Sequence, residues 1–176
     1  MPAKNLIIDL SEIDPGHIVA GLDEIRRVNT QRFEMEQLTA IVYLDVERKI
    51  CVGFKDVTSD EFWVRGHMPG RPLMPGVLML EAAAQLCSYF SYRFEGMGGS
   101  NVIVGFGGLD DVKFREPVFP GDRLFLLCKM ERMRPGKLFV CGFQGVVRGE
   151  IAVEGTLKGV AIPTDAIEPQ SQDSTR

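Results

Sequence analysis

The longest apolar run of the chain covers residues 77–90 and contains only three strongly polar residues, Glu81, Gln85 and Ser88. It predicts a helix from about residue 75 to about residue 94 that is apolar nearly all round, as buried helices are. A membrane span needs roughly 20 predominantly apolar residues. Because this run is shorter and has Glu81 and Gln85 near its middle, we expect a buried core helix and no membrane span.

Strand-like runs precede and follow this helix. They cover residues 38–47, 50–56, 101–107, 111–114, 122–132, 137–147 and 150–161. The run at 122–132 alternates only in part, which indicates a strand buried on both faces. A helix this apolar must be covered, and a sheet face is the only large surface available. The pattern therefore predicts an α+β fold, with a curved antiparallel sheet wrapped around a long central helix.

The remaining segments set the expected domain limits. We expect a single domain over residues 1–162, in which residues 1–28 form an N-terminal extension with a short amphipathic helix near 18–28. The glycine-rich stretch 95–100 predicts a loop. Residues 163–176 are polar without periodicity, and we expect a disordered tail there.

The segment before the central helix holds the first candidate for chemistry, His67. A loop with three prolines and two glycines follows it and leads into the helix, with Pro75 placed where its missing N–H costs nothing. Histidine titrates near neutral pH and serves as a general base. A histidine in a loop is more often an ordinary polar residue, and we interpret His17 in that way.

Glu81 and Gln85 lie four residues apart and therefore share one face of the helix. Glutamate is almost never fully buried without a partner. One interpretation is a structural Glu81 held by a buried hydrogen bond or by a neighbouring subunit. The other is a catalytic carboxyl group that works with His67, which a chain that doubles back, or a second subunit, brings close.

Composition and charge narrow the class of protein. The chain has 176 residues, 45% of them hydrophobic, and a net charge of −4, so nothing indicates a nucleic-acid partner. No signal peptide is visible at the N-terminus. The four cysteines form no C-x-x-C motif, which makes a zinc site unlikely on spacing and is typical of buried thiols in a reducing cytoplasm.

Two long motifs then resemble a known family. Residues 66–85, GHMPGRPLMPGVLMLEAAAQ, resemble the signature G-H-F-P-x-x-P-x-x-P-G-V-L-x-x-E-A-x-A-Q of the β-hydroxyacyl-acyl carrier protein dehydratases of the FabA/FabZ type. Residues 106–122, FGGLDDVKFREPVFPGD, resemble the second signature. Met68 stands where the family usually has Phe, and Glu81 rather than Asp is similar to the FabZ branch. Near residues 29–37, only Arg32 and Phe33 remain of the family's P-H-R-[YF]-P-F-L-L-V-D segment, which leaves the acyl chain length open.

The resemblance implies a hotdog fold and a homodimer, or a hexamer of three dimers, in which His67 of one subunit faces Glu81 of the other. It implies dehydration of a β-hydroxyacyl thioester, on acyl carrier protein or coenzyme A, to a trans-2-enoyl thioester in fatty acid biosynthesis or a related lipid pathway. His67 would remove the α-proton and Glu81 would protonate or orient the departing hydroxyl. The N–H of Gly76, at the positive end of the helix, would bind the thioester carbonyl. Gln85 would support Glu81.

No metal or organic cofactor is needed for this reaction. Candidates for the apolar substrate tunnel are Phe62, Met68 and Met79. Two alternatives stay open: another hotdog acyl-thioester enzyme, such as a thioesterase or an isomerase, and a non-catalytic acyl-binding hotdog. The intact H-x-P-G context of His67 disfavours a thioesterase.

Overall fold

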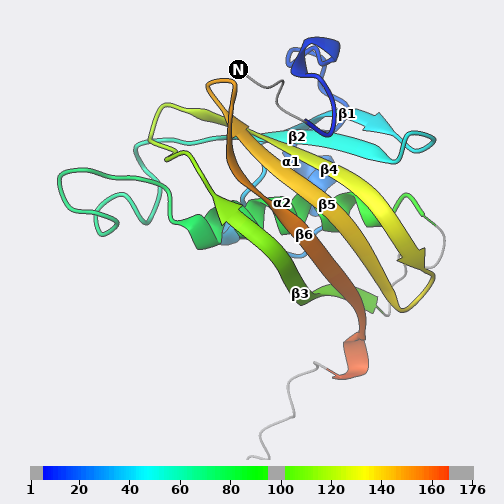
Figure 1. The fold of residues 1–176 in the computed structure, drawn as a ribbon. Coiled ribbons are helices and arrows are strands. Elements are labelled where there is room, and N and C mark those ends of the chain that lie inside the picture. The colour runs from blue at the N-terminus through cyan, green and yellow to red at the C-terminus, as the bar shows by residue number, and fades with distance from the viewer. Residues whose placement is uncertain (1–5, 95–101, 167–176) are drawn as a thin grey trace, which may run out of the picture.

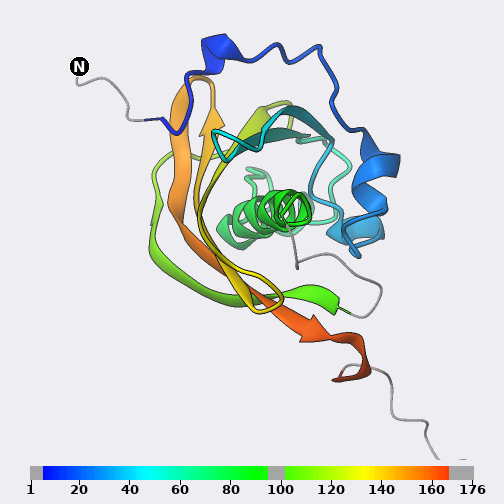
Figure 2. The same ribbon diagram turned by 90° about the vertical axis from the view of Figure 1, so that its right-hand side faces the viewer.

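A computed structural model of the chain describes residues 6–94 and 102–166, which form one six-stranded antiparallel sheet with a long helix (Figure 1). The strands are β1 (Ala40–Asp45), β2 (Ile50–Asp56), β3 (Val102–Phe114), β4 (Arg123–Arg134), β5 (Leu138–Val147) and β6 (Glu150–Pro163). Their order is β1-β2-β4-β5-β6-β3, so β1 and β3 are the edges. The sheet curves around helix α2 (Gly76–Ser91), which Figure 2 shows nearly end-on. The predicted α+β hotdog architecture is confirmed.

Helix α2 forms where the apolar run predicts it and is slightly shorter. Pro75 is its N-cap residue and Tyr92 its C-cap. Leu86 and Phe90 are fully buried in the cluster between the helix and the concave side of the sheet. Burial of each such side chain contributes about 1.5–3 kcal/mol. Val77, in contrast, is 71% exposed, so the helix is not covered on every side.

A second apolar cluster lies on the other face of the sheet. Leu127 of β4 packs there with Ile8 and Ile13 of the N-terminal segment, whereas Leu126 and Cys128 belong to the inner cluster. The prediction that the strand near 122–132 is buried on both faces is therefore confirmed. The N-terminal segment covers the outer face, and its Ile7 N–H donates to Gln144 Oε1 at 2.8 Å.

Several predicted boundaries differ from the structure. The runs 101–107 and 111–114 form the single strand β3, because two register shifts let the strand continue past its glycines. The short helix α1 is only Leu22–Arg26. The reason is that Val19 and Ala20 N–H groups donate to the Ile41 carbonyl and hold that stretch extended.

Three short 3₁₀ helices complete the described part: η1 (Leu10–Glu12), η2 (Phe33–Met35) and η3 (Thr164–Ala166). Strand β6 extends through Pro163 before η3, and the remainder of the predicted tail, like the predicted loop 95–100, lies outside the described residues. Within residues 6–94 and 102–166, no helix is long and apolar enough to cross a membrane.

Candidate active site

His67 lies in the loop that leads from β2 to α2, and its backbone and ring are both anchored. Its N–H donates to the Trp63 carbonyl at 2.7 Å, and its carbonyl accepts from Leu73 N–H at 3.0 Å. Its Nδ1 lies 2.9 Å from the Leu73 carbonyl oxygen. A carbonyl can only accept, so Nδ1 carries the hydrogen in this contact and Nε2 of the neutral ring has a free lone pair. The loop therefore presents an imidazole in the tautomer that suits a base at Nε2.

The N-terminus of α2 opens onto a hollow of about 370 Å³. Gly76 is the first helical residue, and Pro75 before it provides no side-chain cap. The first N–H groups of a helix have no partner within the helix and carry partial positive charge. A Cβ on Gly76 would lie 2.8 Å from the ring of Phe114, so glycine is what lets that ring pack against the backbone here. The site offers N–H donors to a carbonyl oxygen.

Glu81 lies in the next turn of α2 and borders a separate cavity of about 110 Å³. The cavity is formed between the helix and strands β3, β5 and β6. It is lined by Gln31, Glu81, Ala84, Ser88, Val104, Gly105, Phe106, Phe139, Leu157 and Gly159. The carboxyl is half-buried and is the only ionisable group among these lining residues. The lining mixes apolar side chains with the polar side chains of Gln31, Glu81 and Ser88, as in sites that bind a ligand with one apolar and one polar end.

Gln85 connects Glu81 to the segment of residues 29–37, which we call the clasp. Its Nε2 donates to Glu81 Oε1 at 2.8 Å and to the Met35 carbonyl at 2.6 Å. Its Oε1 accepts from Gln37 N–H at 2.8 Å, and its own carbonyl accepts from Asn29 Nδ2 at 2.9 Å. Gln85 is 2% exposed, so these bonds replace the water that a buried amide loses. It supports Glu81 and binds the clasp to the helix at once.

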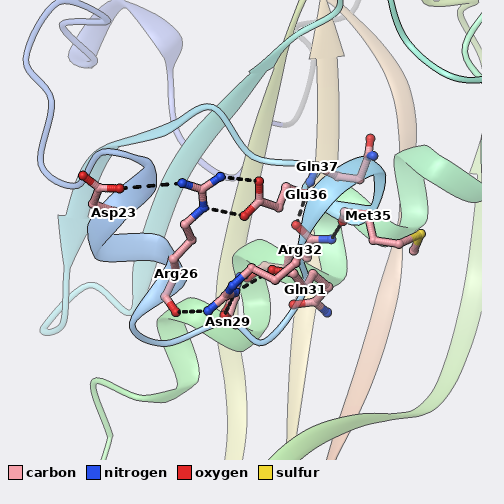
Figure 3. Close-up of polar contacts among 9 residues, drawn as sticks. Asp23, Arg26, Asn29, Gln31, Arg32, Met35, Glu36 and Gln37 are labelled. Atoms are coloured by element: carbon pink, nitrogen blue, oxygen red, sulfur yellow. Dashed lines mark hydrogen bonds and ion pairs between the residues drawn. The ribbon is translucent and has the colours of Figure 1, made fainter.

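Two arginines hold the clasp on its outer side (Figure 3). Arg26 lies between the carboxylates of Asp23 and Glu36, and it makes two bonds of 2.6 and 2.8 Å to Glu36. Arg32 donates to the backbone carbonyls of Asn29 and Arg26, at 2.9 Å each. The N–H bonds from Arg26 lower the pKa of the Glu36 carboxyl. Arg26 therefore holds the C-terminal part of the clasp through Glu36, and Arg32 holds its N-terminal part through backbone carbonyls.

Comparison with known proteins decides the family. A family model described as a FabA-like domain matches residues 29–156, which is most of the chain. The chain belongs to the FabA-like family. The match begins at Asn29, so the clasp lies inside the family domain although its sequence departs from the family pattern.

Curated relatives agree with this assignment. The chain is 36% identical over 137 residues to a protein of Geotalea uraniireducens named 3-hydroxyacyl-[acyl-carrier-protein] dehydratase FabZ. The aligned residues make up 78% of this chain and 93% of the relative. A protein of the same name from Variovorax paradoxus is 41% identical over 118 residues, covering 65% of this chain and 77% of the relative. The resemblance found in residues 66–85 and 106–122 is confirmed.

Comparison with solved structures confirms the fold but does not identify the reaction. A dehydratase heterocomplex, ApeI:P from Xenorhabdus doucetiae, matches with a TM-score of 0.66 at 15% identity, over 82% of this chain and 97% of that one. The fluoroacetyl-CoA thioesterase FlK matches with a TM-score of 0.59 at 9% identity, over 73% of this chain and 96% of that one. Since a dehydratase and a thioesterase share this architecture, the fold alone does not select the chemistry.

Within one copy of this FabA-like chain, the two predicted catalytic side chains do not meet. Glu81 borders the cavity beside β3, and His67 is not among the residues that line it. The hydrogen bonds of His67 and Glu81 within the described residues go to other groups. Gly76 and Glu81 do lie on one helix, five residues apart, which is roughly 7.5 Å along its axis.

The three predicted tunnel residues lie in different places. Met79 is buried and lines the hollow at Gly76. Met68 is 54% exposed beside His67. Phe62 is 53% exposed and lines a different pocket, together with Phe33 of the clasp. The sequence could not separate these cases, because each residue is simply an apolar side chain near the motif.

The cysteines come together in the core although they lie far apart in the sequence. The Sγ atoms of Cys87, Cys128 and Cys141 all lie within 4.8 Å of one another. Spacing missed this group because its members come from α2, β4 and β5. Burial raises the pKa of the Cys51 and Cys128 thiols. Cys87 differs from them, because the contacts of its Sγ with the Cys128 and Cys141 thiols lower the pKa of Cys87.

Proposed function

We propose that this protein is a hydro-lyase that removes water from 3-hydroxyacyl thioesters on acyl carrier protein and so forms trans-2-enoyl thioesters in fatty acid biosynthesis or a related lipid pathway. The proposal is carried by the names of the relatives together with the positions of the motif residues in the structure. The named relatives are 3-hydroxyacyl-[acyl-carrier-protein] dehydratases. The motif residues His67, Gly76 and Glu81 hold positions in which their polar groups are free to act.

His67 serves as the base. Its Nε2 removes the α-proton of the thioester, which is acidic because the carbonyl accepts the resulting charge. The bond from Nδ1 to the Leu73 carbonyl at 2.9 Å keeps the ring in the tautomer that this step needs. The same bond stabilises the imidazolium that forms once Nε2 has taken the proton.

Gly76 stabilises the negative charge that develops on the thioester oxygen. Its backbone N–H lies at the uncapped start of α2, where the helix dipole adds partial positive charge. A fixed donor at the point where charge develops lowers the barrier by more than it would in water. The hollow lined by Leu73, Met79 and Phe114 gives the thioester a place beside that donor.

Glu81 completes the elimination at the β-carbon. It donates a proton to the departing hydroxyl, the C–O bond breaks, and water leaves. The proton held by His67 then returns to Glu81 through solvent, which resets the site. Gln85 holds Glu81 in place by its 2.8 Å bond to Oε1. The acyl chain lies along the cavity towards Ser88, about 10 Å along the helix from Glu81.

Each complete site takes His67 from one copy of the chain and Glu81 from a second copy. Among the described residues, no strand pairs with the outer side of the 13-residue edge strand β3. Phe106 and Phe114 of that strand are 50% and 53% exposed, and Val77 of the adjoining helix is 71% exposed. The first part of this edge, residues 102–109, carries no charged residue and can pair with another strand, and a two-fold axis there repeats the contact in both copies.

The carrier protein docks near the His67 loop. Arg65 and Arg71 flank His67 and are exposed, and neither makes an ion pair with a described residue. Free guanidinium groups suit an acidic partner and steer its approach. Replacing both with alanine should raise KM for the carrier-bound substrate and leave KM for a coenzyme A thioester unchanged.

The test uses the reverse reaction. Crotonyl thioesters of acyl carrier protein and of coenzyme A are mixed with the protein, and the ultraviolet absorbance of the conjugated enoyl group is followed, together with release of free thiol. Loss of enoyl absorbance without thiol release supports the dehydratase. Thiol release identifies a thioesterase instead, and no change on short and long chains contradicts an enzyme of either kind.

A further inference from the structure

The clasp, residues 29–37, is the part of the domain that departs from the family pattern, and it reaches the carboxyl of Glu81. We propose that Gln31 is a positioning residue for Glu81 and selects which carboxyl oxygen faces the substrate. This inference rests on the proposed function for its meaning, since it assigns Gln31 a part in the same elimination.

The geometry of the Glu81 carboxyl carries the proposal. Gln31 Nε2 donates to Oε1 at 3.3 Å, and Gln85 Nε2 donates to the same oxygen at 2.8 Å. Oε2 accepts no hydrogen bond from any residue in the described ranges. Two donors on Oε1 occupy both of its lone-pair directions. The proton of a neutral carboxyl therefore sits on Oε2, the oxygen left free for the departing hydroxyl.

Gln31 is held in place by the chain on either side of it. Two residues before it, Asn29 is bonded to the Gln85 carbonyl at 2.9 Å. Next to it, Arg32 donates to the carbonyls of Asn29 and of Gln31 itself, at 2.9 and 2.6 Å. Six residues after it, Gln37 N–H is bonded to Gln85 Oε1. A side chain between two such anchors keeps its rotamer at small entropic cost, as a preorganised site requires.

The position of Gln31 has a second consequence, since it also lines the cavity beside Glu81. An amide does not titrate, so the donor to Oε1 is present at every pH at which the protein is folded. Removing this bond by mutation leaves Oε1 with the Gln85 donor alone, so one lone-pair direction of Oε1 opens to the proton that the proposal places on Oε2. The expected loss is in turnover rather than in substrate binding.

The activity test compares three variants. Gln31→Ala should lower kcat by about 10- to 100-fold, the range for a hydrogen bond to a charged or reacting group, with KM within about twofold of wild type. Gln31→Glu keeps the shape but removes both N–H donors, so its kcat should fall at least as far. Thr30→Ala, at the exposed neighbour in the clasp, should match wild type. Wild-type kcat in Gln31→Glu would overturn the proposal, because it would show that only the shape of the side chain matters.

A second measurement tests the contact without any turnover. The side-chain amide signal of Gln31 in a ¹⁵N–¹H spectrum is identified by its loss in Gln31→Ala. It should move in Glu81→Ala and stay in place in Thr30→Ala. If the wild type shows no dehydratase activity, the proposed function fails while this measurement still judges the contact; an unmoved signal in Glu81→Ala overturns the inference by itself.

Discussion

Two segments lie against helix α2, and they are held in place by different kinds of hydrogen bond. The loop from Phe62 to Pro75 carries the family motif and is held by backbone bonds, such as those joining His67 to Trp63 and Leu73. The clasp, residues 29–37, departs from the family motif and is held by side chains: Asn29, Gln37 and Gln85 inside, Arg26 and Arg32 outside. The first segment holds His67, and the second contacts the carboxyl of Glu81.

The comparison offers a physical reason why one segment matches the family pattern and the other does not. A loop shaped by prolines and by backbone bonds depends on particular residues at fixed positions. A clasp held by paired side chains needs only that some donors and acceptors meet. This chain keeps Arg32 and Phe33 of the family pattern and still holds its clasp against α2 through Gln85. The departure that leaves the acyl chain length open thus falls on a segment that still contacts Glu81.

The largest effects should come from the two groups that we propose as proton donor and acceptor. His67→Ala and Glu81→Gln should each lower kcat by about 10²- to 10⁴-fold, the usual contribution of a positioned acid or base. The far-ultraviolet circular dichroism and melting temperature should change little, because both side chains are only half-buried.

The matched control is the other histidine. His17 is exposed in the N-terminal segment, and His17→Ala should retain full activity. Equal losses in His17→Ala and His67→Ala would show that the assay reports folding rather than chemistry.

Gln85 should show where the two segments depend on each other. Gln85→Leu leaves the Gln37 N–H and the Met35 carbonyl without their buried partner, which should cost about 2–4 kcal/mol of unfolding free energy. It should also lower kcat, because Glu81 loses a donor. Urea denaturation and steady-state kinetics measure both.

Gln144 provides the comparison for that experiment, since it is 8% exposed and bonded to Ile7 on the opposite face of the sheet. Gln144→Leu should lower stability and leave kcat unchanged. If both variants lose stability and neither loses turnover, Gln85 is a structural residue only.

A substitution at Gly76, directly after the loop that ends at Pro75, tests the contribution of this first segment. Gly76→Ala places a Cβ 2.8 Å from the Phe114 ring, and either the ring or the helix start must shift. Phe114 is 53% exposed and can move, so stability should change by less than about 1 kcal/mol. Displacement of the N–H donor should lower kcat by about tenfold. Gly66→Ala, with no atom within 4 Å of the added Cβ, should behave as wild type.

The smallest effect concerns the outer anchor of the clasp. The pKa of Glu36 is lowered by its bonds to Arg26, so the carboxylate stabilises the fold at pH values above the usual glutamate range. That contribution is lost as the pH falls through the lowered value. The protection of the Gln37 amide against hydrogen exchange, relative to an unfolded chain at the same pH, should therefore fall below the usual glutamate range, and Glu36→Gln should show the lower protection already at neutral pH. An unchanged exchange rate in Glu36→Gln would show that Arg26 does not hold the clasp.

Much of the fold and part of the site follow from the sequence alone. The apolar run in residues 77–90 predicted the buried helix, and the strand-like runs around it predicted a curved antiparallel sheet but not the order of its strands. His67 and Glu81 were singled out as a lone histidine before the helix and a carboxyl group within an apolar helix, and the family resemblance added Gly76 and the predicted roles. Gln31 was missed, since its contact with Glu81 spans fifty positions and depends on how the clasp folds. The exposed stripe at Val77 was missed because an apolar residue that faces a solvent-exposed edge has the same sequence signal as a buried one.

The central claim is that one site needs two copies of the chain, with His67 from one and Glu81 from the other. The direct measurement mixes His67→Ala with Glu81→Gln, each inactive alone, under conditions in which subunits exchange. Half of the dimers then contain one intact site of two, so activity should recover to about a quarter of wild type. A mixture in which all subunits have demonstrably exchanged and which stays as inactive as its components would contradict the account.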